Sequence, residues 1–457
     1  MSRDKGRGKG SVSARELALD VLTRVDENKA YSNLQLNSAL QRASLSSQDA
    51  GLATELVYGT VSRLNTLDYF LERFVTRGIH KLQPWVRNLL RLSLYQIMYL
   101  ERIPPHAVVN EAVNLAKRRG HQGISGMVNG VLRNVLRSHE QLVLPGNLSP
   151  VERIALEHSH PQWLVERWIL QYGESAAEAI CRANNEPPAV SVRVNTTMIS
   201  RDEMLAQMKE AGLNAVASAL SPEGILVLSG GNMALSDWYR DGQISVQDES
   251  SMLVGRAVGP ASGMRVLDCC AAPGGKTAHM AELMEDRGEI IANDLHEHKR
   301  KLISAQAERL GLDSIHTITG DALDLVQKYA PGSFDRILLD APCSGLGVIR
   351  RKPDLKWTKT PGDIGEIAGL QRKLLDSVSS LLRIGGILVY STCTIDPEEN
   401  EGTVRHFLET HPGFGLPEKS SAEWDKLDSA AEGVGVQILP QDYNSDGFYI
   451  SRLQRFS

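Results

Sequence analysis

The first third of the chain carries apolar residues at the spacing of an amphipathic α-helix. In "ARELALDVLTRV" the residues on one face are Leu17, Val21, Leu22 and Val25. The stretch "VRNLLRLSLYQIMYL" repeats this spacing, and "ERIPPHAVVNEAVNLAKRRG" places a Pro-rich turn before a helix with a cationic last turn and a closing glycine. The pattern predicts an all-α domain over residues 13–140.

Beyond this domain the periodicity changes from helical to mixed. The stretch "VLPGNLSP" separates the first helices from another helical pattern, "HPQWLVERWILQYG", so residues 141–185 are predicted to be a helical linker. In "NNEPPAVSVRVNTT" apolar and polar residues alternate as in a half-buried strand, and the helical pattern "SRDEMLAQMKEAGL" follows. We therefore expect a small α/β subdomain over residues 186–258.

The last part of the chain, residues 259–457, alternates short apolar strands with helical patterns. The predicted strands are "MRVLD", "EIIAND", "SIHTITG", "FDRILLD" and "GILVYST". Such alternation predicts a doubly wound, Rossmann-like α/β domain with a parallel sheet. Ligands of these sheets bind beyond the carboxyl ends of the strands, so the loops after each strand are where chemistry is expected.

Composition and charge indicate where the protein is located and what kind of partner it binds. Hydrophobic residues make up 42% of the chain, and no apolar run approaches a membrane span. Residues 1–12 are polar, basic and Gly/Ser-rich, so we expect a disordered arm without a signal peptide and a cytoplasmic protein. Residues 1–140 hold 20 Lys and Arg against 12 Asp and Glu, although the whole chain has a net charge of −5. This asymmetry indicates a polyanion-binding module, while a solvated helical surface would show the same charge.

The loop after the first strand, "DCCAAPGGKTAHM", is rich in small residues. It fits neither a P-loop, which needs glycine where Cys270 stands, nor the dinucleotide fingerprint G-x-G-x-x-G. The second strand ends in Asn293 and Asp294, where a carboxylate can hold ribose hydroxyls, and Asp321 follows the third. Together these loops predict a site for an adenosine-containing ligand that lacks a pyrophosphate.

The five cysteines are odd in number and show no CxxC or metal-binding spacing, so neither a disulfide framework nor a metal site is expected. Two of them follow the fourth and fifth strands, Cys343 in "DAPCSGLG" and Cys393 in "YSTCT". Buried structural thiols are the alternative. A thiolate that adds to carbon 6 of cytosine makes carbon 5 nucleophilic toward a methyl group, so two loop thiols beside an adenosine-type cofactor indicate carbon methylation. The spacing does not decide which thiol attacks.

The stretch "GVIRRKPDLKWTKT" directly follows the Cys343 loop. Its cations around Trp357 are Arg350, Arg351, Lys352, Lys356 and Lys359. Cations that hold phosphates beside an aromatic that stacks on a base are typical of single-stranded RNA recognition, although a solvated loop can have the same composition. We expect this stretch to contact RNA.

The motifs "DCCAAPGGKT", "DAPCSGLG", "STCT" and "DGFYISRL" together resemble those of the RNA cytosine-C5 methyltransferase family, which uses S-adenosylmethionine on a class I methyltransferase fold. The resemblance covers the chain from Val246 onward. The helical third, with "TELVYGTVSR" and "MVNGVLRNVLR", resembles the NusB-like RNA-binding domain of the bacterial branch that acts on 16S rRNA.

This resemblance implies a function and a set of site residues. Residues implied to bind S-adenosylmethionine are Cys270, Ala271, Ala272, Pro273, Gly274, Gly275, Lys276, Asp294, Asp321 and Asp340. Those with implied catalytic roles are Cys393 as the nucleophile, Cys343 in release, Asp340 beside the methionine amine or the target base, and Lys276. The implied substrate is a single-stranded or loop cytosine of 16S rRNA. A tRNA or 23S rRNA substrate, a non-catalytic RNA-binding or ribosome assembly factor and a redox dithiol remain alternatives, and neither the target nucleotide nor the oligomeric state follows from the sequence.

Overall fold

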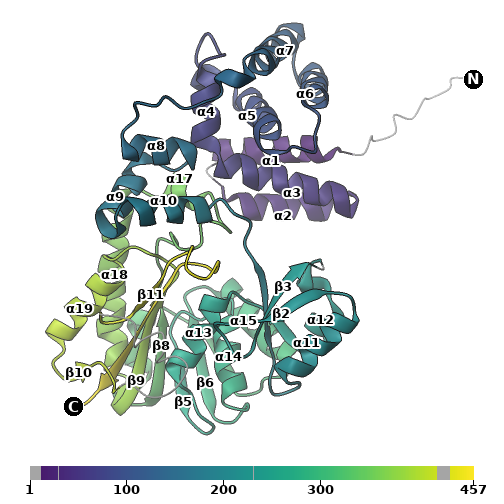
Figure 1. The fold of residues 1–457 in the computed structure, drawn as a ribbon. Coiled ribbons are helices and arrows are strands. Elements are labelled where there is room, and N and C mark those ends of the chain that lie inside the picture. Colours follow the sequence, from purple (N-terminus) through teal and green to yellow (C-terminus); the bar gives the residue numbers. More distant parts are fainter. Residues whose placement is uncertain (1–11, 29, 230, 419–432) are drawn as a thin grey trace, which may run out of the picture. The chain divides into compact units, whose positions relative to one another are not determined.

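The computed structural model describes residues 12–28, 30–229, 231–418 and 433–457 (Figure 1). The chain divides into two compact units. The helical unit holds residues 1–186 together with Ile349–Thr358, and the second unit holds Pro187–Val348 and Lys359–Ser457. The predicted arm lies, apart from Val12, outside the described residues. None of the helices in the described ranges is long and apolar enough to cross a membrane.

The helical unit is built from amphipathic helices joined by short turns. They are α1 (Ala14–Asn28), α2 (Ser32–Arg42), α3 (Ser47–Ser62), α4 (Leu64–Glu72), α5 (Pro84–Tyr99), α6 (Pro105–Arg119), α7 (Gln122–Arg137), α8 (Pro150–Glu157), α9 (Gln162–Tyr172), α10 (Glu174–Ala183) and the short α17 (Leu355–Thr358). Leu17, Val21 and Leu22 of α1 are buried as the spacing predicts, and they pack in one core with α3 and α5.

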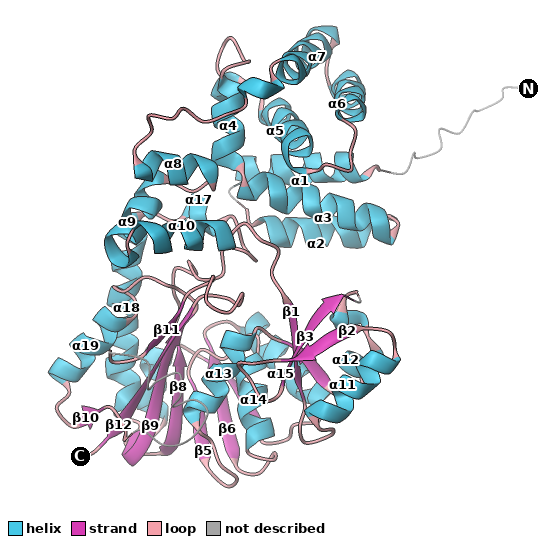
Figure 2. Ribbon diagram, in the orientation of Figure 1, coloured by secondary structure: helices cyan, strands magenta, loops and turns pink. Residues whose placement is uncertain are grey.

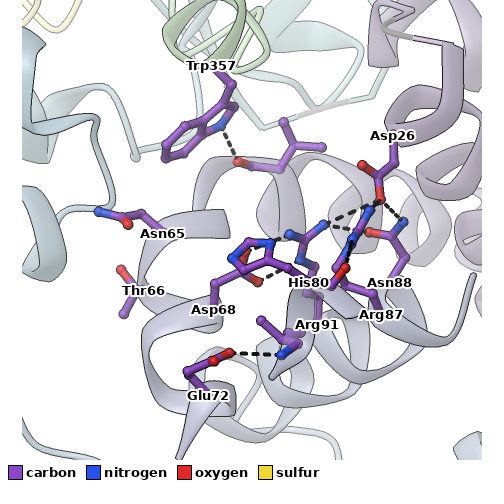
Figure 3. A network of polar contacts seen from close by, with 12 residues as sticks. Asp26, Asn65, Thr66, Asp68, Glu72, His80, Arg87, Asn88, Arg91 and Trp357 are labelled. Atoms are coloured by element: carbon purple, nitrogen blue, oxygen red, sulfur yellow. Dashed lines mark hydrogen bonds and ion pairs between the residues drawn. The ribbon is translucent and has the colours of Figure 1, made fainter. Parts of the chain in front are cut away.

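A polar network joins three of these helices beside the core (Figure 3). Arg87 of α5 pairs with Asp26 of α1 at 2.6 Å, and Asn88 donates to the same carboxylate at 2.9 Å. One turn further along α5, Arg91 pairs with Asp68 of α4 at 2.6 Å. Because these side chains are largely removed from water, the bonds fix how α1, α4 and α5 lie against each other.

The second unit begins with a small antiparallel sheet (Figure 2). Its strands are β1 (Val190–Val194), β2 (Asn214–Ala217), β3 (Gly224–Ser229) and β4 (Ile244–Val246), in the order β2-β3-β1-β4. The helices α11 (Arg201–Glu210) and α12 (Asp237–Arg240) belong to it. Val192 and Val194 are buried against Met204 and Met208 of α11. The expected alternation of buried and exposed residues is not observed, because Val190 is exposed whereas Ser191 and Arg193 are buried.

A larger sheet carries the five predicted strands of the last domain. They are β5 (Arg265–Asp268), β6 (Glu289–Asp294), β7 (Ile315–Thr319), β8 (Phe334–Asp340) and β9 (Leu382–Thr392), and they are parallel to one another. The strands β10 (Phe414–Gly415), β11 (Val436–Ile438) and β12 (Phe448–Arg455) add an antiparallel edge. The order is β10-β12-β9-β8-β5-β6-β7, so the direction of winding reverses at β5.

Helices cover both faces of this sheet (Figure 2). On one face Val266, Leu338 and Val389 pack against α13 (Glu249–Val258) and α14 (Gly275–Leu283). On the other face Leu267, Ile337 and Leu388 pack against α18 (Pro361–Ser379) and α19 (Glu401–Thr410). The remaining helices, α15 (Glu297–Leu310) and α16 (Leu325–Lys328), lie in the connections after β6 and β7. Successive residues of each strand thus point into the hydrophobic cores on opposite faces of the sheet. The predicted doubly wound fold is confirmed.

A buried ion pair joins the small sheet to helix α14. Arg193 of β1 donates to both carboxylate oxygens of Glu282, at 2.9 and 2.8 Å, and both side chains are buried. The same guanidinium donates to the carbonyl of Gly275 at 2.9 Å. The small sheet therefore holds the first turn of α14, where the Gly-rich loop ends.

Candidate active site

The strand order brings the predicted site loops to one edge of the larger sheet. β5 pairs with β6 on one side and with β8 on the other, and β8 pairs with β9, all in parallel. The loops that begin at Asp268, Asp294, Asp340 and Cys393 therefore leave the same edge. The reversal of winding at β5 is the point where doubly wound sheets bind their ligands.

Backbone hydrogen bonds hold the loop after β5. The amide of Ala271 donates to the carbonyl of Asn293 at 2.8 Å, and that of Gly274 donates to Ala271 at 2.8 Å. Gly274 has φ +104°, and a Cβ there would lie 3.1 Å from the Cα of Ile303. Glycine is required at this position, since a side chain would meet both backbone strain and a packed neighbour. The turn leads into α14, whose first amides have no helical partner.

Asp268 lies under this loop and is buried. It accepts a hydrogen bond from Thr277 Oγ1 at 2.7 Å. Burial, together with the charge of Asp340, raises the pKa of Asp268 to about 7, even though Thr277 and Lys276 act in the opposite direction. The sequence analysis did not single out this carboxyl.

Lys276 and Asp340 connect the Gly-rich loop to the end of β8. The Lys276 amine lies 2.6 Å from Asp340 Oδ2, while Ser391 of β9 donates to Oδ1 at 2.8 Å. Burial disfavours the charged amine, but the Asp340 carboxylate outweighs it and raises the pKa of Lys276. The amine also lies 4.9 Å from the ring centre of Phe448, which belongs to the motif "DGFYISRL".

Cys343 and Cys393, predicted on neighbouring loops, face each other. Their sulfur atoms are 3.3 Å apart, and both residues are partly accessible. The hydrogen bond to Cys393, followed by burial and the neighbouring negative charges, raises the pKa of Cys343 well above its usual value. Either sulfur can be the donor of this pair.

Two backbone bonds and one buried carboxylate hold the Cys343 loop. The amide of Gly347 donates to the carbonyl of Cys393 at 3.0 Å, and the amide of Gly447 donates to that of Gly347 at 2.8 Å. A Cβ on Gly347 would overlap the Gly447 carbonyl, so the two loops approach as closely as glycine allows. Glu399 accepts from the amide of Ser344 at 2.8 Å, and burial raises the pKa of Glu399.

Other buried polar side chains complete this support and were not predicted. Gln371 of α18 donates to the carbonyl of Pro342 at 2.9 Å and to Glu399 at 3.1 Å. The hydroxyls of Ser344 and Thr394 lie 2.8 Å apart. The only sequence signal for Glu399 was the acidic run after Cys393, and spacing alone does not separate a supporting carboxylate from a helix cap.

The two acidic residues predicted after β6 and β7 lie in different surroundings. Asp294 is buried, and its oxygens accept from the amides of Ala272 and His296, both at 3.3 Å. Beside it, Asn293 donates to the carbonyls of Cys269 and Gly320, both at 3.0 Å. Asp321 is exposed, and its carboxylate accepts from the amide of Leu323 at 3.0 Å as the cap of a short 3₁₀ turn.

The remaining cysteines have no role as thiolates in this arrangement. Cys181 and Cys269 are fully buried, and burial is the main cause that raises the pKa of each thiol. Burial also raises the pKa of Cys270, whose side chain faces the core on the α18 side of the sheet. These three residues are small apolar side chains at neutral pH.

The expectation that "GVIRRKPDLKWTKT" contacts RNA is wrong for its central residues. Lys356 is fully buried, and it donates to the carbonyl of Ser62 at 2.9 Å. Burial lowers the pKa of this amine well below its usual value. The indole of Trp357 donates to the carbonyl of Val61 at 2.8 Å and packs on the helical core, and Arg350 is also buried. Lys356 and Trp357 serve packing, because carbonyls in the last turn of α3 accept their hydrogen bonds.

One group of side chains could in principle ligate a metal, which the sequence spacing did not indicate. Glu157, His158 and Glu178 lie close together in the helical unit. Arg153 pairs with both carboxylates, at 3.2 and 2.7 Å, so their charge is already balanced by a guanidinium. This group lies in the helical unit, whereas the predicted site residues lie in the second unit.

A Rossmann-like sheet with a Gly-rich loop after its first strand, acidic residues after the next strands and a thiol pair defines a class of cofactor-dependent group-transfer enzymes. Comparison with known families specifies it further. Residues 256–454 match the family model described as 16S rRNA methyltransferase RsmB/F. Residues 12–137 match the NusB family, and residues 160–234 match the ferredoxin-like domain of RsmF/B-like methyltransferases.

Individual relatives agree with the family models. The chain is 46% identical to the probable ribosomal RNA small subunit methyltransferase B of Bacillus subtilis, over 97% of this chain and 99% of that protein. It is 36% identical to the ribosomal RNA small subunit methyltransferase B of Pseudomonas syringae pv. tomato, over 97% of each chain. Among solved structures, NSun6 from Pyrococcus horikoshii with SFG has a TM-score of 0.57 and 25% identity, and the match covers 65% of this chain and 98% of that chain.

The chain belongs to the RsmB/F family of 16S rRNA methyltransferases, and it is an RNA methyltransferase of the class that depends on S-adenosylmethionine. The predicted family is confirmed. The predicted fold class is confirmed as well, with a NusB-like helical domain, a small ferredoxin-like domain and a Rossmann-like methyltransferase domain.

Proposed function

We propose that the protein methylates carbon 5 of a specific cytosine in 16S rRNA through a covalent bond between Cys393 and carbon 6 of the base. The observation that carries this proposal is the pair of sulfur atoms 3.3 Å apart at the ligand-binding edge of the sheet. Carbons 5 and 6 of cytosine are adjacent, so a nucleophile for one and a proton acceptor for the other must also be adjacent. Methylation of an exocyclic amine would need no thiol.

The residues after β5 and β6 fit S-adenosylmethionine. The amides at the start of α14 suit a carboxylate, and the Asp294 carboxylate at the end of β6 suits ribose hydroxyls. The side-chain oxygen of Asn293 is a buried acceptor without a partner among the described residues, and it suits a ligand donor. The bound cofactor would supply an electrophilic methyl group. Residues from Cys270 to Lys276, with Asp294 and Asp340, would hold the cofactor. Asp321 is exposed, and its carboxylate, which caps a short turn, would have to contact the cofactor from that position.

The proposed reaction assigns attack to Cys393. Its thiolate forms the S–C6 bond, and the electrons of the C5=C6 bond make carbon 5 the nucleophile that takes the methyl group. The Lys276–Asp340 pair lies beside the thiols and fixes a positive charge and a hydrogen-bond acceptor next to the base. Asp340, which accepts from Ser391, can receive a further donor such as an amino group.

The causes of the raised Cys343 pKa explain how release would follow attack. The hydrogen bond to Cys393 and the charge of Cys393 both keep the proton on Cys343. Once the Cys393 sulfur is bonded to carbon 6, it carries no charge, and these two causes disappear. Cys343 can then lose its proton to water. Its thiolate takes the proton from carbon 5, while the C5=C6 bond returns and the S–C6 bond breaks to release Cys393 as a thiolate.

The substrate proposal rests on the relatives named as 16S rRNA enzymes and on the charge of the first third of the chain. The NusB-like unit would add RNA affinity, and we expect the enzyme to act in the cytoplasm on an unpaired cytosine, whose ring is accessible to thiols. The test is bisulfite sequencing of 16S, 23S and transfer RNA after incubation with the full-length enzyme and S-adenosylmethionine. One 16S cytosine should resist conversion only with active enzyme. Resistance confined to another RNA, or a methyl group on nitrogen, would refute the proposal.

A further inference from the structure

Residues Ile349–Thr358 follow the Cys343 loop in the chain but belong to the helical unit. The segment is therefore an insertion of the second unit that folds as part of the first. Leu355 is buried, and Trp357 packs against the helical core. The contacts that hold this segment lie at the ends of two helices.

Asp354 serves the amino end of helix α2. The residue before this helix, Tyr31, makes no side-chain capping bond. Asp354 accepts from the amide of Ser32 at 3.1 Å and from its hydroxyl at 2.5 Å, and both residues are buried. A carboxylate is the group that the positive end of a helix favours, so Asp354 caps α2 from a position far along the chain.

Lys356 and Trp357 serve the carboxyl end of helix α3. The carbonyls of Val61 and Ser62 belong to its last turn, which lacks helical donors. The Trp357 indole donates to the carbonyl of Val61. The Lys356 amine donates to Ser62 and, at 3.3 Å, to Asn185 Oδ1. Both side chains donate to carbonyls that have no partner within the helix. An acid on one helix start and a base on another helix end together fix the direction of the segment.

The preceding loop is fixed in the second unit. The Gly347 amide donates to the carbonyl of Cys393, the Gly347 carbonyl accepts from the amide of Gly447, and the Ser344 amide donates to Glu399. Val348 is the single residue between Gly347 and the first residue of the segment, Ile349. The loop that carries Cys343 is thus attached at its far end, with almost no slack, to a segment held by the helical unit. A loop that runs directly into a folded segment has fewer conformations than one that runs into a flexible segment.

We propose that Ile349–Thr358 is an anchor through which the helical unit positions Cys343, with Asp354, Lys356 and Trp357 as positioning residues for the release step. The helical unit then contributes to chemistry in addition to RNA binding. The part of this inference that concerns release rests on the proposed role of Cys343.

The test uses the full-length protein with Lys356→Met, which removes the amine, or Trp357→Phe, which removes the indole donor but keeps a ring. Matched controls are Lys209→Met, at the exposed last turn of α11, and Trp238→Phe, whose indole donates to Gln207. Backbone hydrogen exchange from Ser344 to Val348 is measured without RNA. Loss of a buried bond should raise the exchange rate about tenfold in the anchor variants and leave the controls unchanged.

The second readout is the covalent protein–RNA adduct at saturating RNA and S-adenosylmethionine, seen on a denaturing gel beside Cys343→Ala. The anchor variants should accumulate adduct, which a merely structural role would not produce. The anchor proposal would be overturned if both anchor variants exchange at the wild-type rate and form no adduct while Cys343→Ala does form one. Raised exchange without adduct in Cys343→Ala would support anchoring and overturn the release role of Cys343. If Lys356→Met also raises exchange throughout α2 and α3, the milder Trp357→Phe decides.

Discussion

The sulfur atoms of Cys343 and Cys393 lie 3.3 Å apart, although fifty residues separate the two cysteines in the chain. Strands β8 and β9 are parallel neighbours in which Asp340 is opposite Ser391, so both cysteines follow the same edge of the sheet. The hydrogen bond to Cys393, followed by burial, raises the pKa of Cys343 well above its usual value. Two thiols so close to each other suit two successive steps of one reaction.

The first prediction separates attack from release. Cys393→Ala should abolish methylation and form no covalent complex, because the nucleophile is missing. Cys343→Ala should accumulate a protein–RNA adduct that survives denaturing electrophoresis, because attack proceeds and release is slow. The double variant should form no adduct. Labelled RNA on a denaturing gel measures all three.

Cys181→Ala is the matched control for this series, since Cys181 is a buried thiol of the helical unit. It should retain methylation without trapping RNA. An adduct in Cys393→Ala would reverse the assignment of the two cysteines. No adduct in either single variant would leave the covalent mechanism without support.

The sequence predicts this edge of the sheet because parallel strands have a simple rule. Apolar strands that alternate with helices place their carboxyl ends together, so Asp340, Cys343 and Cys393 could be assigned to one site without coordinates. The side-chain chemistry of the two loops then indicates the reaction. The sequence does not predict Glu399 as the acceptor for the Cys343 loop, because its partners come from α18 and from the loop itself.

The fate of Lys356 and Trp357 could not be predicted for a different physical reason. A segment of cations around an aromatic has the composition of an RNA-binding loop and also that of a helix-end anchor. Which one it becomes depends on acceptors 294 and 296 residues away, at the end of α3. No local periodicity or motif in the sequence indicates these hydrogen bonds, because only the fold brings the donors and acceptors together.

The second prediction concerns cofactor affinity. Asp294→Ala should weaken binding of S-adenosylmethionine by about 1–3 kcal/mol, because the ribose donors would remain buried without an acceptor. Asp294 is also an acceptor for Ala272, so the loop itself should become looser. Asp321→Ala is the control, and a smaller loss is expected since Asp321 is exposed. Calorimetry on the full-length protein gives both affinities, and equal losses would contradict the assigned difference.

The third prediction is a dependence of stability on pH. The pKa of Asp268 is about 7 in the folded protein, raised mainly by burial, against about 3.9 in an unfolded chain. Between these values the folded state holds a proton that the unfolded state releases. The stabilisation is complete below the unfolded pKa and is lost as the pH rises through about 7, with a slope of up to about 1.4 kcal/mol per pH unit.

Asp268→Asn removes this titration while it keeps the size of the side chain. The difference in unfolding free energy between wild type and variant should therefore shift in favour of the variant as the pH rises from about 5 to about 8. Denaturant unfolding without cofactor at several pH values measures it. Parallel pH profiles for the two proteins would show that Asp268 does not titrate in this range.

The fourth prediction concerns the buried pair Arg193–Glu282. Arg193→Met should destabilise the protein by about 3–5 kcal/mol, because it leaves the Glu282 carboxylate buried without its partner. Replacing both residues with methionine should recover much of this loss, since no unpaired charge remains. The solvent-accessible pair Arg300–Glu297 on α15 is the control, and Arg300→Met should cost far less stability than Arg193→Met. Denaturant unfolding of the four proteins tests this. If the double variant is as unstable as Arg193→Met, the bond from Arg193 to the Gly275 carbonyl, rather than the ion pair, is what holds the small sheet against α14.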